Sequence, residues 1–132
     1  MPTRSEQVAY PIVSYEEADA AIEWLKRAFG AEELAVYKGD DDRVEHMELS
    51  FEGGVVMGGS KGVGELASRV ELGGPTSIYL VVSDPDAHHE RAVAAGAEVV
   101  IPLRDEEYGS RGYSALDPEG NVWSFGTCRP EV

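Results

Sequence analysis

Two short stretches in the two halves of the chain resemble each other. They are residues 29–32 (Phe-Gly-Ala-Glu) and residues 95–98 (Ala-Gly-Ala-Glu). Each follows a segment that has the pattern of a β-strand running into a helix, and the 132 residues divide naturally into two such units. Internal repetition of this kind predicts two copies of one supersecondary module. We expect a ligand site on the surface that the two modules together enclose.

In the first half, the pattern predicts a strand, a helix and then three strands. Ser14 and Glu17 have the spacing of a capping box, in which each side chain accepts a hydrogen bond from the other residue's amide. Apolar residues at helical spacing then predict a helix that ends at Gly30. The predicted strands are residues 8–13, 34–38, 43–51 and 55–59.

The second half repeats this order of elements. Asp84 is the predicted N-cap of a helix with Pro85 at its first position, and Gly96 closes that helix. The predicted strands are residues 76–83, 97–102, 111–116 and 121–127. We therefore predict a single domain over residues 1–132, with modules at 7–59 and 76–127 and a glycine-rich linker at 60–75.

The charge of the chain excludes one class of partner. The formal net charge is -14, and the clustered Lys and Arg residues that bind phosphates are missing, so nucleic acid is not an expected partner. The single Cys128 cannot form an intrachain disulfide. Neither a signal peptide nor a membrane-spanning apolar run is recognisable, so the cytoplasm is the expected location and a membrane is not an expected partner.

Alternating side chains give each predicted strand two different faces. In residues 43–51, one face carries Met47, Leu49 and Phe51, and the other carries Val44, His46, Glu48 and Ser50. We expect the apolar faces, including Trp123 and Phe125, to form the core beneath the helices. Two curved sheets would then leave a mixed polar and aromatic inner surface, which describes a cleft.

Two runs of sequence carry a resemblance to a known family. They are residues 18–32 (ADAAIEWLKRAFGAE) and residues 108–125 (YGSRGYSALDPEGNVWSF). Over nearly its whole length the chain resembles the vicinal oxygen chelate (VOC) superfamily of glyoxalases, bleomycin-resistance proteins and ring-cleaving dioxygenases. It is most similar to the PhnB-like and uncharacterised glyoxalase-type branch. The resemblance implies an α+β fold of two βαβββ modules, each a curved half-barrel sheet with its helix on the outer face.

The resemblance also implies where a metal would bind. Metal-using members place a His on the first strand and a Glu on the last strand of each module, around one divalent ion. Counting from the repeated glycine motif puts Tyr10 and Ser77 at the first-strand positions. The last-strand positions fall at Met57 or Gly58 and at Ser124. None of these is a good ligand for zinc, nickel or iron, so we predict no metal and no other cofactor.

His46 and Glu48 are the candidate catalytic residues. They lie two residues apart on one predicted face, where an imidazole that titrates near neutrality has a carboxylate to orient it. The pair could form part of a displaced metal site, but two ligands are too few for a stable centre unless another chain contributes more. The other predicted inner-face residues are candidate ligand-binding residues: Tyr10, Ser77, Tyr79, Arg111, Tyr113 and Ser124.

Four of the polar residues have structural alternatives. Arg111 is as well explained by an ion pair with an acidic residue among residues 105–107, and core packing is the alternative role of Tyr113. His88 and His89 are neighbours on a helix and point in different directions, so we expect both at the solvated surface.

Three hypotheses for function follow. The first is a metal-free protein that binds a small organic molecule in its cup, and a cationic drug would fit an acidic protein. The second is a metal-dependent lyase, isomerase or dioxygenase of the same superfamily, with ligands at other positions. The third is a metal-free enzyme that uses His46 as a base. The resemblance further implies a homodimer in which modules of two chains complete each cup.

Overall fold

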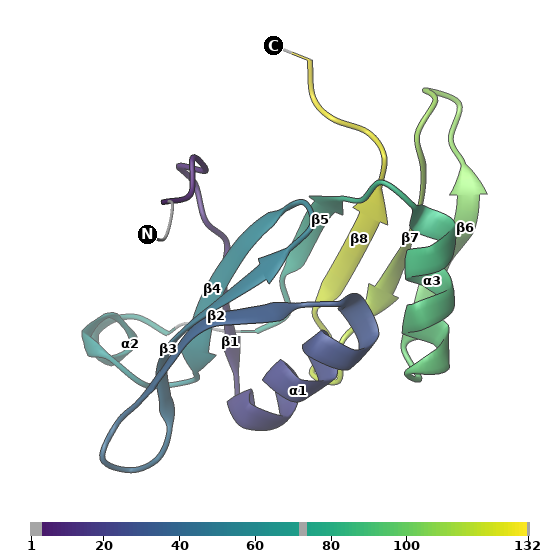
Figure 1. Cartoon of the computed structure of the whole chain (residues 1–132). Helices are drawn as coiled ribbons and strands as arrows, with labels where there is room; N and C mark the ends of the chain where they lie inside the picture. Colours follow the sequence, from purple (N-terminus) through teal and green to yellow (C-terminus); the bar gives the residue numbers. More distant parts are fainter. Residues whose placement is uncertain (1–3, 72–73, 132) are drawn as a thin grey trace.

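The computed structural model describes residues 4–71 and 74–131 and arranges them in two adjacent β-sheets with helices packed against them (Figure 1). The first half comprises β1 (Ile12–Tyr15), α1 (Ala18–Phe29), β2 (Glu32–Lys38), β3 (Val44–Phe51) and β4 (Gly54–Ser60). The second half comprises β5 (Ser77–Val81), α3 (Pro85–Ala94), β6 (Glu98–Asp105), β7 (Arg111–Leu116) and β8 (Val122–Gly126). The short helix α2 (Glu65–Arg69) lies between them, inside the predicted linker.

The two sheets have the same topology. Sheet A has the strand order β1-β4-β3-β2, and sheet B has the equivalent order β5-β8-β7-β6. In each sheet the first and last strands of the module are parallel neighbours, with Ile12 opposite Met57 and Tyr79 opposite Ser124. The predicted α+β fold of two repeated βαβββ modules is therefore confirmed.

The two long helices end and begin at the predicted signals. Gly30 follows α1 in the left-handed conformation (φ 74°), and its amide donates to the carbonyl of Leu25. Asp84 caps α3, since its carboxylate accepts from the amide of Ala87 at 3.0 Å, and Pro85 occupies the first turn.

The start of the first module differs from the prediction. β1 begins at Ile12 instead of residue 8, and Ser14 lies inside this strand, so it does not cap α1. The amides of Glu16 and Glu17 donate instead to the Glu119 carboxylate, at 2.8 and 3.0 Å. Glu119 belongs to the turn between β7 and β8. A carboxylate of the second module therefore stabilises the start of the first helix.

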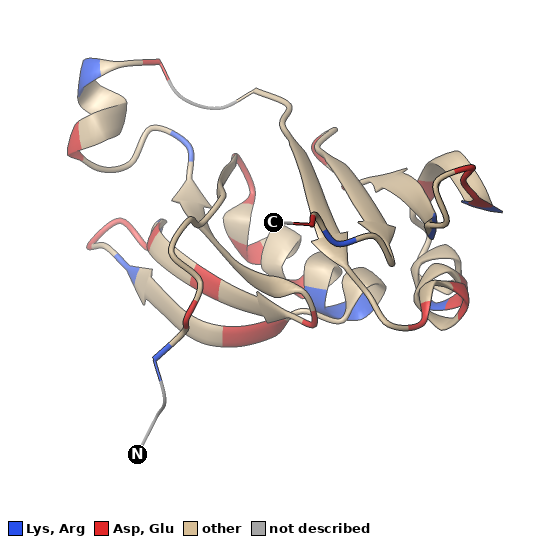
Figure 2. Ribbon diagram, turned by 90° about the horizontal axis from the view of Figure 1, so that it is seen from above, with Lys and Arg blue, Asp and Glu red and all other residues tan. Residues whose placement is uncertain are grey.

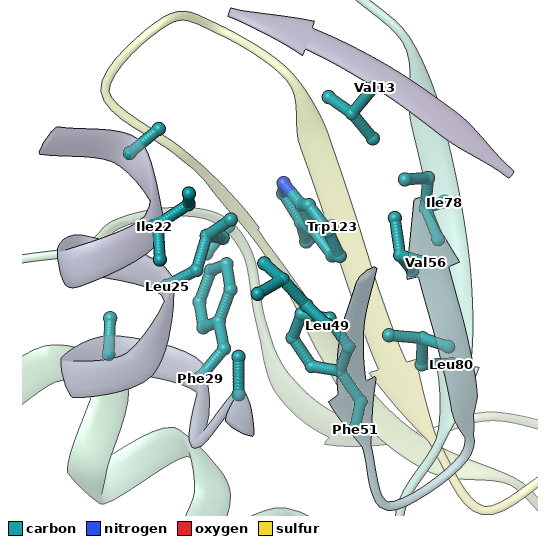
Figure 3. Close-up of a cluster of buried hydrophobic side chains, with 14 of the residues drawn as sticks. Val13, Ile22, Leu25, Phe29, Leu49, Phe51, Val56, Ile78, Leu80 and Trp123 are labelled. Carbon is teal, nitrogen blue, oxygen red and sulfur yellow. The ribbon is translucent and has the colours of Figure 1, made fainter. Parts of the chain in front are cut away.

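The apolar faces of both sheets meet α1 in one core (Figure 3). Trp123 of β8 lies between Leu25 and Phe29 of α1 on one side and the strands of sheet A on the other. Its ring centroid is 5.3 Å from that of Phe51 and 5.7 Å from that of Phe29. The prediction that Met47, Leu49, Phe51, Trp123 and Phe125 form the core is confirmed, since all five are buried.

Val44 does not follow the predicted alternation. It is only 1% exposed, although the sequence places it on the same face as His46. Tyr37 pairs with His46 while the next residue, Lys38, pairs with Val44, so Glu45 is the extra residue of a β-bulge. The bulge turns Val44 into the core.

A buried carboxylate connects the two modules. Oδ2 of Asp117 accepts hydrogen bonds from the Tyr15 hydroxyl at 2.6 Å, from Nδ2 of Asn121 at 2.9 Å and from Nε1 of Trp123 at 3.0 Å. Its Oδ1 accepts from the amides of Glu119 and Asn121. Burial, and next the charge of Asp117, raise the pKa of the Tyr15 hydroxyl, so this group stays a donor. Tyr15 is the one member that belongs to the first module.

His88 fills part of a second contact between the modules. Its ring centroid lies 4.1 Å from that of Phe125 and 6.0 Å from that of Phe29, and its Nδ1 is 2.5 Å from the Tyr113 hydroxyl. The expectation that His88 lies at the solvated surface is therefore wrong. Burial, with a smaller contribution from Arg91 in the same direction, lowers the pKa of His88.

A cavity of about 340 Å³ adjoins His88 at the end of α1. Three of its polar lining groups already have protein partners. Glu52 accepts from the amide of Ser83, Asp84 caps α3, and Arg91 donates to the carbonyls at the end of α1. Because Glu52 and Arg91 connect the two modules, we interpret this cavity as part of the packing between them.

Acidic residues occur along the ribbon of both modules, and the fewer basic residues lie at separate places (Figure 2). Among the described residues, none of the helices combines the length and apolar character needed to cross a membrane.

We predict that Asp117→Asn lowers the free energy of unfolding by about 3 kcal/mol, because the NH2 of the new amide would replace one of two accepting oxygens and would face buried donors whose hydrogen bonds it cannot accept. Urea denaturation measures this change. Asp105→Asn is the control, since the exposed Asp105 carboxylate pairs with Arg111 alone among the described residues, and a much smaller change is expected there. Equal effects of the two substitutions would contradict the role of Asp117.

We also predict that His88 makes the fold less stable at acidic pH. Above about pH 6.5 His88 is neutral in both states; as pH falls further, the unfolded chain takes up the proton more readily, because burial lowers the folded-state pKa. Stability is therefore lost as pH falls from about 6.5 toward the folded pKa. The melting temperature of His88→Gln should fall less between neutral and mildly acidic pH than that of the wild type. His89→Gln, the matched control, should behave like the wild type.

Candidate functional site

We call the side of each sheet that faces away from the core its open face. On the open face of sheet A, Nε2 of His46 lies 2.7 Å from Oε2 of Glu48, and the two side chains are 38% and 37% exposed. Tyr37 lies beside them on β2, with its ring 6.1 Å from the His46 ring and inclined to it by only 20°. The structure thus brings the two candidate catalytic residues together and adds an aromatic neighbour.

The sequence contained no sufficient signal for Tyr37. Its position beside His46 depends on the pairing of β2 with β3, which contains two irregularities in register. One of them is the bulge at Glu45, directly before His46. Bulges often occur beside functional sites, because they change the direction of a neighbouring side chain.

A groove of about 230 Å³ runs over the open face of sheet A. Its floor contains Ile12 and Ser14 of β1, His46 of β3 and Met57 of β4, and residues 63–67 form a wall. The lining therefore combines apolar surface with a hydroxyl and an imidazole that contacts a carboxylate. Such a mixture suits a small organic molecule with both apolar and polar parts.

The open face of sheet B carries three of the predicted ligand-binding residues: Ser77, Tyr79 and Ser124. The exposed Tyr79 donates its hydroxyl to the carbonyl of Cys128 at 2.8 Å. The hydroxyl of Ser124 lies 2.6 Å from that of Ser114. Ser114 was not predicted. It shares this face because it is directly opposite Ser124 in the ladder between β7 and β8.

Arg111 and Tyr113 do not line the open face. Arg111 forms ion pairs with Asp86 of α3 at 2.7 Å and with Asp105 at 3.3 Å. Tyr113 is buried, opposite Phe125 in the β7–β8 ladder, and burial raises the pKa of its hydroxyl. The prediction that these two residues share the inner face is wrong, because alternation along β7 places them on the helix-facing side.

Tyr10 also lies away from its predicted position. It precedes β1, and its hydroxyl donates to the carbonyl of Gln7 at 2.7 Å. The strand begins two residues later, at Ile12. The prediction that Tyr10 lies on the first strand is therefore wrong.

The chemistry of the side chains does not fit the metal that the family resemblance implies. At the paired positions of the first and last strands, the structure has Ile12 with Met57 and Tyr79 with Ser124. These side chains offer no imidazole, thiolate or carboxylate ligand. Within the part of the chain that the structure describes, no three His, Cys, Asp or Glu side chains gather closely enough to hold a metal ion.

Comparisons with known sequences agree with this fold. A family model described as the Glyoxalase/Bleomycin resistance protein/Dioxygenase superfamily matches residues 7–125. An uncharacterised protein of Mycobacterium bovis is 35% identical over an alignment that covers 100% of this chain and 90% of the relative. An uncharacterised protein of Mycobacterium tuberculosis is also 35% identical, with coverage of 100% and 81%.

Solved structures show the same architecture. TioX from Micromonospora sp. ML1 has a TM-score of 0.79 and 31% identity, covering 96% of this chain and 99% of that protein. A glyoxalase-related enzyme from Fulvimarina pelagi has a TM-score of 0.68 and 18% identity, covering 94% and 89%, which is a likeness of fold alone. With two repeated βαβββ modules and a family model that spans both, the chain belongs to the Glyoxalase/Bleomycin resistance protein/Dioxygenase superfamily.

Proposed function

We propose that this protein binds a small planar organic cation in the groove on the open face of sheet A, without the superfamily metal. The observation that carries the proposal is the row of Tyr37, His46 and Glu48, in which His46 itself lines the groove and Glu48 pairs with Met57 of the groove floor. A planar cation can lie against the exposed Tyr37 ring, whose face attracts positive charge. The Glu48 carboxylate lies within the same row and complements that charge.

The charge of the whole chain supports a cationic ligand. With 25 acidic residues against 11 basic ones, the chain attracts cations at long range and repels anions. A neutral or zwitterionic molecule would gain less from these charges.

We also propose that two copies of the chain complete the cup. Both sheets bury their helix-facing sides in one shared core, so the open faces point away from it. Ile12 and Tyr37 on sheet A are 65% and 61% exposed, and Tyr79 on sheet B is exposed as well. Large apolar side chains on two complementary faces favour association. In such a homodimer Ser77, Tyr79 and Ser124 of one copy would bind the ligand from the side opposite His46.

Two further proposals follow from the sequence. We place the chain in the PhnB-like and uncharacterised glyoxalase-type branch, on the resemblance of residues 18–32 and 108–125. We place its action in the cytoplasm, since its single cysteine forms no intrachain disulfide.

The contact between His46 and Glu48 favours a second candidate function. A carboxylate 2.7 Å from an imidazole can orient it, so His46 can act as a base toward a carbonyl compound bound in the groove. This candidate needs no metal, and it uses the same site as the binding function.

Binding is tested by titration with acridine orange, a planar cationic dye, followed by fluorescence anisotropy at moderate salt. The wild type should bind it saturably, and Tyr37→Ala and Glu48→Gln should each weaken binding about fivefold. Val93→Ala and Glu90→Gln are matched controls on the exposed surface of α3 and should keep the wild-type affinity. Equal losses in all four variants, or no saturable binding, would count against the site.

The enzyme candidate predicts exchange of an α-proton. Wild-type protein in heavy water should exchange the α-protons of a small carbonyl compound, as followed by proton NMR, and His46→Ala should abolish this exchange while still binding acridine orange. If the wild type exchanges the α-protons of no compound in a broad carbonyl panel faster than His46→Ala does, the enzyme candidate is rejected and the binding function is left as the proposal.

The homodimer predicts a solution mass of twice that of the chain, measured by light scattering after size exclusion. Ile12→Asp places a charge on the open face and should give a folded monomer, because burying an unpaired carboxylate is unfavourable. Val93→Asp introduces the same charge on α3 and should remain a dimer. A monomeric wild type would sink the proposal.

A further inference from the structure

The segment 62–69, which contains α2, has few attachments to the rest of the protein. None of the residues of α2 is buried, and the helix stands away from the body of the molecule at the outer end of sheet A (Figures 1 and 2). Its hydrogen bonds are internal: Ser68 Oγ donates to the Glu65 carbonyl at 2.6 Å, and Arg69 Nε donates to the Glu65 carboxylate at 3.2 Å. Within the described residues, the one hydrogen bond that joins residues 62–69 to the rest of the chain runs from the amide of the next residue, Val70, to the Leu66 carbonyl at 3.0 Å.

Lys61, directly before this segment, is still hydrogen-bonded to the body of the protein. The amide of Lys61 donates to the Tyr15 carbonyl at 2.9 Å, and the Arg43 guanidinium contacts the Lys61 carbonyl. Gly62 and Gly64 follow with φ of 76° and 94°, in the region that favours glycine. A Cβ atom at Gly64 would meet nothing within 4 Å, so the backbone conformation, and not lack of space, favours glycine there. Two such glycines next to a fixed residue can act as a hinge.

The segment faces the proposed ligand site. Residues 63–67 form the wall of the groove whose floor includes Ile12, His46 and Met57. Leu66 is 61% exposed and also lines a neighbouring cavity of about 320 Å³ with Ile12 and Thr76. A large apolar side chain is therefore exposed beside an apolar floor, and a ligand lying between them would remove both from water.

We infer that the segment 62–69 determines which ligands the groove accepts, with Leu66 as the contact residue and Gly62 and Gly64 as the hinge. This inference rests on the proposed function. The ligand class is a planar cation with an apolar extension: its charged ring system lies at Tyr37 and Glu48, and its extension reaches between Leu66 and Ile12. The segment closes over that extension when the ligand binds.

The test compares two dyes on the full chain. Acridine orange carries the planar cation alone, and nonyl acridine orange adds an alkyl tail to it. Wild-type protein should bind the tailed dye more tightly, and Leu66→Ser should reduce this advantage about fivefold, because it weakens binding of the tailed dye more than binding of acridine orange. Leu34→Ser is the matched control, because Leu34 is 55% exposed on β2 outside the groove, and it should keep the wild-type advantage.

Hydrogen exchange gives a second readout on the same samples. Amides of residues 65–70 should exchange rapidly in the free protein and slow down with the tailed dye, but not with acridine orange. If both dyes bind and Leu66→Ser keeps the full advantage of the tail, the role of Leu66 is overturned while the proposed function stands. If residues 65–70 exchange equally with both dyes, the closure is overturned. If neither dye binds the wild type, the proposed function fails and this inference fails with it.

Discussion

The buried carboxylate of Asp117 is the constraint on which the relative placement of the two modules depends. A charge in the core is tolerated only when its hydrogen-bonding capacity is used, and here the Tyr15 hydroxyl, the Trp123 indole and Asn121 supply the donors. Since Tyr15 comes from the first module and the other donors from the second, satisfying Asp117 fixes β1 against the β7–β8 turn. The same turn supplies Glu119 to the start of α1, so one short loop connects the modules twice.

This arrangement decides which surfaces remain for function. The apolar sides of both sheets pack in the shared core. The open faces carry polar pairs that take no part in this packing: His46–Glu48 on sheet A and Ser114–Ser124 on sheet B. Arg111 and Tyr113, by contrast, hold α3 in place through Asp86 and His88. The candidate site is therefore formed by polar side chains that the packing of the core leaves exposed.

Much of this could be predicted from the sequence, because alternation along strands and helix-terminal signals act locally. The repeat, the core faces and the ends of α1 and α3 at Gly30 and Asp84 follow from such signals. The predictions are wrong where contacts between residues far apart in the sequence determine the local structure. Glu119 caps α1 in place of Ser14, the bulge at Glu45 reverses the direction of Val44, and the docking of α3 partly buries His88. For Tyr37 the missing information was the register of β2 against β3.

The shared core has a consequence for the ancestry of such a chain. A half-length polypeptide with this pattern would leave the apolar side of its sheet in water until it met another copy of itself, whereas the duplicated chain carries that counterpart covalently. In the joined chain, the requirement for apolar residues applies to the faces that pack in the shared core. At matching places in the ladders, Glu48 stands opposite Met57 in one half and Ser114 opposite Ser124 in the other, so the pairs turned to solvent differ between the halves.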